Sequence, residues 1–514
     1  MKKLSRTEYS LINMTTGILG YGLNTVIGFV CRIVFVRILS AEYLGISGLF
    51  THILSMLSLA ELGISSAITF ALYKPIAQDD EEKIASIMQF YRKAYIVIGV
   101  TVAIIGLILF PFLDLIITDV PNIKENIHLL YLLYLFNTVE SYFFSYRQSL
   151  LTAMQRQYIV IGYSYIVTIL QSILQIIFLS ITKEYLTYLL IQIVAVFLYN
   201  VWISRKAVKD YPYIKNKNIP KLSHEETRDL LKNVKALAIN KVSGVLVNST
   251  DNIAITYFQG LSSVGFASNY TLFSTTLDKL ITQLFNGLTG SVGNLNASTD
   301  DETKYQFFKT LNLANFWLYG WAALGITFVS GDLVSWFYGS SYVMKMNIPL
   351  ILALNFYSIG MLHAVYTYKS TLGLFRYGQY LLFLTGVINL VLDVLFGRLW
   401  GTFGIYFATL IARICTNLWY EPYALYRYGL KKKPILYLKR YFIFTGILFI
   451  TGAICFILCN MCNFSAVINV LLKIIICSVV PNIIFYLCFR KTQEFIYLLE
   501  SLKRILFRAI QRNR

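Results

Sequence analysis

The chain has 514 residues, of which 57% are hydrophobic and only 14% are charged, whereas an ordinary soluble domain carries about a quarter charged residues. This composition excludes a soluble fold. Each of five stretches without Asp, Glu, Lys or Arg is long enough to cross a hydrocarbon core, which takes roughly 20 helical residues: 158–182, 185–204, 310–331, 346–368 and 441–461. A membrane β-barrel would show alternating segments of about ten residues instead. The sequence therefore predicts an all-α integral membrane protein.

Apolar runs separated by charged breaks predict about fourteen transmembrane helices in chain order. The first run follows Lys2, Lys3 and Arg6 as in a signal peptide, but no small-residue cleavage site ends it, so we expect it to remain as a helix. The expected spans are 11–36, 44–72, 94–117, 127–147, 158–182, 185–204, 234–258, 264–293, 310–330, 347–370, 378–400, 403–426, 440–461 and 466–489.

The distribution of basic residues predicts the topology. With the N-terminus inside, five of the 45 Lys and Arg lie in or beside outer loops, five lie within spans, and the other 35 lie in cytoplasmic segments. Cytoplasmic enrichment of this kind orients membrane proteins, so both termini are expected in the cytoplasm. Much of the net charge of +19 then faces the anionic inner leaflet, and no nucleic-acid partner is needed to explain it.

Charge and hydropathy also predict the domain organisation. A basic loop, 205–233, separates an N-terminal six-helix bundle, 1–204, from a second bundle, 234–426. An extra helix pair, 427–489, and a basic amphipathic tail, 490–514, follow. We expect the tail to lie on the cytoplasmic membrane surface, with a partner-binding role as the alternative.

A short internal repeat supports the two-bundle organisation. Ile33–Gly45 aligns without gaps, at an offset of 220, with Ile253–Gly265, and both segments lie at the turn from the first helix of a bundle into the second. Bundles with equal orientation imply a symmetry axis along the membrane normal. Such a pair would enclose a central cavity and suit alternating access.

Several chemistries are excluded by the same pattern. No loop exceeds about thirty residues, and no phosphate-binding glycine motif is present. We therefore expect no enzyme, no ATP-driven step and no organic cofactor. Cys459 and Cys462 form an isolated CxxC without a second pair or a histidine, so we interpret it as packing and expect no metal site.

Ionisable residues inside spans are the candidate functional residues, since each costs roughly 2.5–3.5 kcal/mol at the centre of a helix unless it meets a partner or water. Three of them lie near span ends and are expected to snorkel toward water: Lys241, Asp393 and Lys473. The others lie deeper: Arg32, Glu61, Glu140, Asp251, Asp278, Lys279 and Arg413.

The densest polar run is Asn248–Asn252 in the seventh span. It either lines a cavity, which we favour, or hydrogen-bonds the two bundles together. Glu61 lies among small residues suited to helix packing, so a structural and a functional role are equally compatible with it. Arg413 is expected to pair with an acid or to meet an anionic substrate.

The chain resembles the polysaccharide flippases, the Wzx-like branch of the multidrug/oligosaccharidyl-lipid/polysaccharide exporter (MOP) superfamily. The segments that carry this resemblance, together with the arrangement of six, six and two helices, are Arg37–Gly45, Glu61–Ala67, Leu72–Pro75 and Ser249–Asn252. The resemblance implies a MATE-like fold of two six-helix bundles with an added helix pair. It places the chain in the bacterial cytoplasmic membrane.

The resemblance also implies a function. An undecaprenyl-pyrophosphate-linked oligosaccharide would be flipped from the inner to the outer leaflet for capsule, O-antigen or related polymers. Membrane lipids, a polysaccharide polymerase and glycosyltransferases would be the other partners, and H⁺ or Na⁺ could drive the step. Candidate substrate-binding residues are Arg32, Arg37, Lys279, Arg413 and Asn248, and candidate ion-coupling or counter-charge residues are Glu61, Asp251 and Glu140.

Two other functions remain open from the sequence. A cation-coupled multidrug exporter of the same fold would favour an acidic, aromatic-lined cavity. A non-transporting scaffold would instead tether glycan-assembly enzymes through its basic loops and tail.

The charge distribution makes a testable prediction about topology. Reporter fusions after Lys217, Lys432 and Arg514 should read cytoplasmic, and fusions near Asn122, Ser262 and Ser340 should read external. Paired alkaline phosphatase and green fluorescent protein fusions measure both outcomes. An external signal from Lys217 combined with a cytoplasmic one from Ser340 would contradict the fourteen-helix topology.

Overall fold

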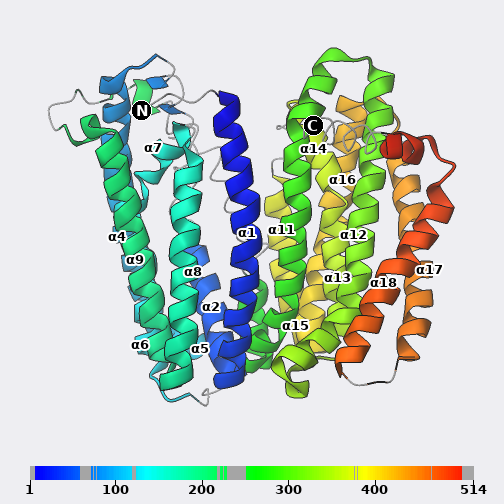
Figure 1. Ribbon diagram of the computed structural model, residues 1–514, viewed down its shortest axis with the longest axis horizontal. Coiled ribbons are helices and arrows are strands. Elements are labelled where there is room, and N and C mark those ends of the chain that lie inside the picture. The colour runs from blue at the N-terminus through cyan, green and yellow to red at the C-terminus, as the bar shows by residue number, and fades with distance from the viewer. Residues whose placement is uncertain are drawn as a thin grey trace, which may run out of the picture. The chain divides into compact units, whose positions relative to one another are not determined.

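The computed structural model consists of helices joined by turns and short loops, and no strand occurs among the residues that it describes (Figure 1). The described residues are 6–57, 71–72, 75–76, 78–117, 123–154, 156–216, 220, 222–223, 225–228, 250–374, 377–378, 380–462, 464 and 466–500. Contacts divide the chain into two compact units, Met1–Gly265 and Phe266–Arg514, called unit 1 and unit 2 below.

Unit 1 is a bundle of long helices joined by short ones. Helix α1 packs on α8, α8 on α9, and α6 on α4 and α9. Asn126 accepts hydrogen bonds from the backbone N–H groups of His128 and Leu129 and so caps α6. The elements are α1 (Arg6–Ile38), α2 (Ala41–Leu57), α4 (Glu81–Leu109), η2 (Phe110–Phe112), α5 (Leu113–Ile116), α6 (Ile127–Ser145), α7 (Gln148–Ala153), α8 (Gln157–Thr182), α9 (Tyr185–Asp210) and η3 (Pro212–Lys215).

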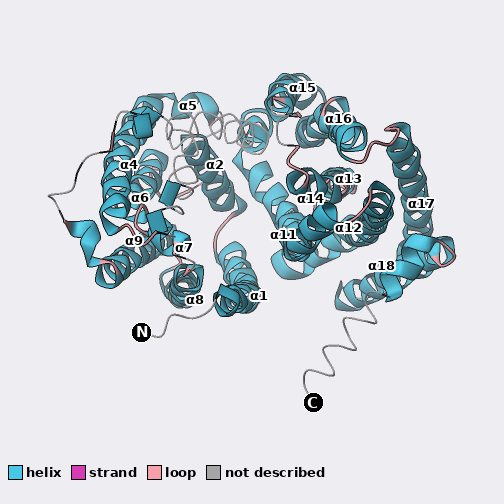
Figure 2. Cartoon of the chain, turned by 90° about the horizontal axis from the view of Figure 1, so that it is seen from above, coloured by secondary structure: helices cyan, strands magenta, loops and turns pink. Residues whose placement is uncertain are grey.

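Unit 2 is built around α12–α14, which Figure 2 shows among the other helices of this unit. In the most apolar part of 347–371, which comprises α13 and α14, 78% of residues are buried, against 28% in α17. The elements are α11 (Leu261–Ser298), whose first residues belong to unit 1, α12 (Asp301–Tyr338), η4 (Ser340–Tyr342), α13 (Asn347–Gly360), α14 (His363–Thr371), α15 (Leu381–Cys415), α16 (Asn417–Ala424), η5 (Leu425–Gly429), α17 (Ile435–Asn460) and α18 (Ala466–Phe489).

The predicted all-α membrane class is confirmed. Each expected span overlaps helical residues, although only 250–258 of the seventh span can be compared. The expected boundary between 378–400 and 403–426 lies inside α15, where Gly401 adopts φ 59° and ψ −138° and interrupts the helix. This left-handed φ is open to glycine because it has no Cβ. Among the described residues, eight helices are long and apolar enough to cross a membrane.

Several helices continue beyond the apolar spans. Helix α4 begins at Glu81 and α12 at Asp301, each after an aspartate whose side chain accepts hydrogen bonds from the first turn. At α12 this residue is Asp300, and hydrogen bonds from Thr303 lower the pKa of its carboxyl. Hydropathy locates the part of a helix that lies in lipid, whereas these polar caps determine where the helix begins.

Charged pairs hold together one end of unit 2. Lys432 Nζ binds Glu302 Oε2 at 2.7 Å and lowers the pKa of that carboxyl. Arg440 Nη1 binds Glu494 Oε1 at 2.9 Å, so the first helical turns of the tail contact α17. Phe495 stacks on Trp317 with ring centroids 5.5 Å apart. The beginning of the tail therefore packs on unit 2, and residues 501–514 lie outside the described part.

The two copies of the internal repeat meet in a reciprocal contact within unit 1. An ideal Cβ on Gly45 would lie 2.1 Å from the carbonyl oxygen of Leu261, and one on Gly265 would lie 2.2 Å from that of Ala41. Gly265 and Leu261 lie 220 residues after Gly45 and Ala41, which is the offset of the repeat. Exchanging the two copies therefore converts one contact into the other. Ser262 donates to Glu42 Oε1 at 3.4 Å beside them. Such self-complementary contacts are the signature of a two-fold relation.

This contact predicts that Gly45→Ala and Gly265→Ala are destabilising. The added methyl group would overlap a main-chain oxygen, and overpacking typically costs about 1–3 kcal/mol. Gly28→Ala on α1 is the control, because a Cβ there meets nothing within 4 Å. Thermal unfolding of the purified protein in detergent should show lower midpoints for the first two variants only. Equal unfolding midpoints for the three variants would contradict the close approach of Gly45 and Gly265 to the opposite main chain.

Candidate functional site

The candidate residues in unit 1 occupy different environments. Arg37, at the end of α1, is exposed, and Arg32 and Asp251 are half-buried. The charge of Arg32 acts on the Tyr188 phenol of α9. Glu61 and Asn248 lie outside the described residues. Arg32, Arg37 and Asp251 are thus at least partly exposed on the surface of unit 1.

Glu140 on α6 is deeply buried, with 5% of its surface exposed. Its Oε1 accepts a hydrogen bond of 3.3 Å from Asn200 Nδ2 on α9, and its Oε2 has no hydrogen-bond partner among the described residues. No basic side chain of the described part lies within ion-pair distance of it. A carboxylate in such a position is costly unless it meets a basic partner or water, so Glu140 remains a candidate for ion coupling or for a counter-charge.

The polar run of the seventh span is partly packed against α2. Thr250 is 3% exposed, and Asn252 Nδ2 lies 3.8 Å from the position of a Cβ on Gly48. Asp251, between them, is half-buried. At least part of the run therefore packs helices together, and Asp251 is the residue best placed for another role.

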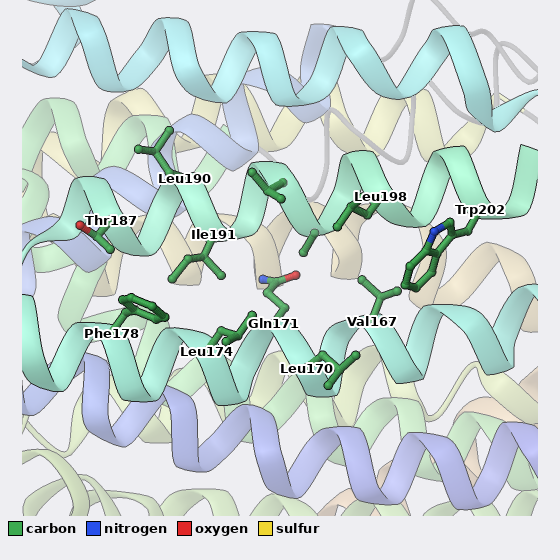
Figure 3. Close-up of a pocket in the computed structure, with 12 residues that line it drawn as sticks. Val167, Leu170, Gln171, Leu174, Phe178, Thr187, Leu190, Ile191, Leu198 and Trp202 are labelled. Carbon is green, nitrogen blue, oxygen red and sulfur yellow. The ribbon is translucent and has the colours of Figure 1, made fainter.

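An apolar groove of about 390 Å³ runs between α8 and α9 (Figure 3). Gln171 points toward the space between the two helices, where its Nε2 donates to Gln175 Oε1 at 3.3 Å. Leu170, Phe178 and Leu190 line the groove and are exposed. A surface of this kind accommodates hydrocarbon chains, whereas sugars and pyrophosphate would lose their hydration there without replacement.

Two charged residues of unit 2, Asp278 and Arg413, belong to one polar cluster, defined here as Asp278, Tyr319, Asn355, His363 and Arg413. Tyr319 on α12 donates to Asp278 Oδ1 on α11 at 2.9 Å. His363 Nε2 on α14 lies 3.4 Å from the same oxygen. The five residues come from five helices, α11 to α15.

Arg413 forms the cationic side of this polar cluster. Its Nη1 donates to Asn355 Oδ1 at 3.2 Å and to the Asn355 carbonyl oxygen at 3.4 Å. It lies close enough for its charge to act on the Asp278 carboxylate. The predicted pairing of Arg413 with an acid stays a prediction, with Asp278 as an acid on which its charge acts. Lys279, the neighbour of Asp278, is exposed and makes no ion pair among the described residues.

One expectation of snorkelling is wrong. Asp393 is fully buried and accepts a 2.9 Å hydrogen bond from Asn389 Nδ2, one turn earlier on α15. Its side chain is short and lies in the interior of the hairpin that α15 forms about Gly401. Lys473 is half-buried and forms a 2.6 Å ion pair with Asp332 of α12, so its snorkelling stays a prediction. Lys241 lies outside the described residues.

A buried ion pair was missed by the sequence analysis. Lys369 of α14 pairs with Glu421 of α16, and its Nζ also donates to the Tyr377 carbonyl oxygen at 2.9 Å. Both side chains are about nine-tenths buried. Each partner lies near the end of an apolar stretch, where a charge ordinarily reaches water, so no local pattern indicates that the two residues pair. His363 was missed for another reason: only Asp, Glu, Lys and Arg were counted as ionisable residues of the spans, and histidine was not.

Comparison with known proteins identifies the family. A model of the family described as "Polysaccharide biosynthesis protein" matches residues 10–297, more than half of the chain. The chain belongs to this family. No curated protein matches its sequence.

Solved structures show that this polysaccharide biosynthesis protein has the fold of MOP-superfamily transporters. The inward closed lipid II flippase MurJ is 15% identical, with a TM-score of 0.68 over 92% of this chain and 98% of MurJ. An inward-facing multidrug resistance MATE transporter is also 15% identical, with a TM-score of 0.57 over 79% and 95%. A variant of the Vibrio cholerae MATE transporter VcmN is 14% identical, with a TM-score of 0.54 over 83% and 99%. The fold of this chain is therefore one that known transporters share.

The Lys369–Glu421 pair predicts a non-additive stability pattern. Lys369→Met or Glu421→Leu alone should lower stability by about 3–5 kcal/mol, because each leaves a buried charge without its partner. The double variant should recover most of that loss. Chemical unfolding of the three variants in detergent micelles measures the coupling energy.

A surface pair provides the control for this cycle. Lys431 and Asp301 are 2.9 Å apart with side chains 73% and 46% exposed, so Lys431→Ala should change stability by less than about 1 kcal/mol. Additive losses at Lys369 and Glu421 would argue against a sealed ion pair.

Proposed function

We propose that this polysaccharide biosynthesis protein flips an undecaprenyl-pyrophosphate-linked oligosaccharide from the inner to the outer leaflet of the bacterial cytoplasmic membrane. The observation that carries the proposal is the polar cluster of unit 2, in which half-buried Arg413 lies at transmembrane depth. An arginine there costs several kcal/mol unless it has polar partners or water. A pyrophosphate crossing the membrane needs a cation of this kind to replace its hydration.

The chemistry of the family and of its structural relatives supports the same substrate class. The family name concerns polysaccharide biosynthesis, and MurJ is named a lipid II flippase. In our proposal Arg32, Arg37, Lys279, Arg413 and Asn248 contact the substrate during the cycle. Glu61, Asp251 and Glu140 provide counter-charges or bind the coupling ion, either H⁺ or Na⁺. The substrate enters the synthesis of capsule, O-antigen or another surface polysaccharide.

The topology and partners form part of the same proposal. Both termini lie in the cytoplasm, where the lipid-linked glycan is assembled by glycosyltransferases, and a polymerase receives it outside. The transport cycle follows alternating access, in which the substrate site opens to one side of the membrane at a time. The scaffold alternative gives no reason for charged clusters at transmembrane depth, whereas transport does.

A multidrug exporter is the competing function, because MATE transporters share the fold. It would bind cations and would therefore favour exposed acids over Arg413 as the substrate contact. Parallel assays of ethidium efflux and of glycolipid flipping distinguish the two functions directly.

The proposal predicts graded losses at Arg413. Arg413→Lys should retain part of the flipping activity, because a lysine keeps the charge but cannot form a two-pronged contact with phosphate oxygens. Arg413→Ala should lose roughly ten-fold to a hundred-fold, as expected for a hydrogen bond to a charged group worth about 1.5–3 kcal/mol. Asp251→Asn, which keeps the shape and removes the charge, should slow turnover more than it lowers protein abundance.

Flipping is measured in proteoliposomes with a fluorescent polyprenyl-pyrophosphoryl oligosaccharide whose outer-leaflet fraction is quenched by dithionite. Arg92→Ala, on the exposed surface of α4, is the matched control and should leave flipping unchanged. Wild-type rates in both Arg413 variants and in Asp251→Asn, at equal protein abundance, would refute the charged-cavity mechanism.

A further inference from the structure

His363 lies where the tenth predicted span is interrupted. Helix α13 ends at Gly360, Met361 and Leu362 form a turn, and α14 begins at His363. Breaks of this kind inside a membrane span are tolerated where the backbone is buried in protein or lines a water-filled cavity. In a span that is otherwise apolar, this break places a titratable imidazole at transmembrane depth.

The imidazole is positioned by an aromatic stack. The His363 ring lies parallel to the Tyr319 ring, with centroids 5.4 Å apart and an interplanar angle of 6°. The phenol of the same tyrosine donates to Asp278 Oδ1, the oxygen that His363 Nε2 approaches to 3.4 Å. This separation exceeds the 2.7–2.9 Å of a charge-assisted hydrogen bond. The distance between His363 Nε2 and Asp278 Oδ1 can therefore shorten when the imidazole becomes charged.

The His363–Asp278 pair is accessible, in contrast to the other ion pair of α14. The side chains of His363 and Asp278 are 20% and 38% exposed, whereas those of Lys369 and Glu421 are 10% and 9% exposed. The sealed pair cannot exchange protons readily with water. The open pair can do so, and a ligand can also reach it.

The charged and titratable groups around His363 come from each neighbouring element. Asp278 and Tyr319 face it from α11 and α12, and the charge of Arg413 on α15 acts on Asp278. On α16, Glu421 is engaged by Lys369. Two other basic residues nearby in sequence are exposed: Lys279 on α11 and Arg427 on η5. Asp278 is thus the acid through which His363 and Arg413 are coupled.

We propose that His363 and Asp278 form a proton-operated switch that sets the affinity of the Arg413 site for pyrophosphate diesters. With neutral His363, the charges of Asp278 and Arg413 cancel, and the polar cluster attracts an anion weakly. A proton that binds the imidazole stays on the ring and satisfies Asp278, so the polar cluster gains a net positive charge. Proton and anion then bind cooperatively, each increasing the affinity for the other. This inference rests on the proposed function for the identity of the anion.

Two substitutions should act in opposite directions, which separates the switch from misfolding. His363→Gln cannot take up the proton, so anion affinity should no longer rise in acid. Asp278→Asn removes the negative charge and keeps an oxygen that can accept from Tyr319. It should therefore bind the anion tightly at both acid and alkaline pH.

The probe is geranyl-pyrophosphoryl N-acetylglucosamine, a pyrophosphate diester whose own charge is constant near neutral pH. Its dissociation constant is measured on detergent-purified full-length protein at about pH 6 and about pH 8, which bracket the range in which imidazoles ordinarily titrate. For the wild type we expect roughly ten-fold tighter binding at the lower pH, the size of effect that one added charge has at short range. His363→Gln should show no such difference.

The chain provides a matched control in unit 1. His128 Nε2 lies 3.5 Å from Asp114 Oδ1, so His128→Gln removes a histidine from a similar pair outside the polar cluster. It should retain the pH dependence of the wild type. Loss of this dependence in His128→Gln, or its persistence in His363→Gln, would overturn the switch.

The outcomes also separate this inference from the proposed function. If the glycolipid is flipped but pH dependence survives in His363→Gln, the switch is wrong and the function stands. If the probe binds with the predicted pattern but no glycolipid is flipped, the switch stands and the function fails. If the wild type binds the probe at neither pH, both are refuted.

Discussion

The free-energy cost of a charge at membrane depth governs the polar architecture of unit 2. An ionised side chain in hydrocarbon must find an opposite charge, a hydrogen-bonding neighbour or water. Lys369–Glu421 and Lys473–Asp332 solve this with direct ion pairs between helices. Asp278 instead accepts a hydrogen bond from a tyrosine and lies near a histidine, and Arg413 donates a hydrogen bond to an asparagine side chain. The first arrangement fixes helix positions, and the second leaves charge within reach of a ligand.

The two kinds of arrangement occur on the same short helix. Helix α14 carries His363 at its first residue and Lys369 near its last turn. The lysine ties one end of the helix to α16 through a buried ion pair. The histidine lies at the other end, next to the break, and its ring nitrogen is 3.4 Å from the Asp278 carboxylate. A helix that is anchored at one end and adjustable at the other can transmit a local change of charge to its neighbours.

The sequence predicted the fold much better than the site. Helix positions follow from hydropathy, which is a property of local segments, and even the turn at Gly401 was located to within a few residues. The partners of the charges depend on which helices pack together, and no local pattern contains that information. Asp278 was recognised as an intramembrane charge, but its contacts with Tyr319 and His363 join residues 41 and 85 positions away in sequence. Asp393 was misjudged because its depth depends on the hairpin around Gly401.

The reciprocal contact between the repeat copies has an evolutionary consequence. A clash between two side chains can be relieved by shortening either one, so ordinary packing faults have simple second-site remedies. At Gly45 and Gly265 the obstacle is a peptide oxygen of the other copy, and no substitution can delete a peptide oxygen. Both segments of the repeat are therefore constrained at this position at once. Neither half can acquire a side chain at this position unless both helices move apart.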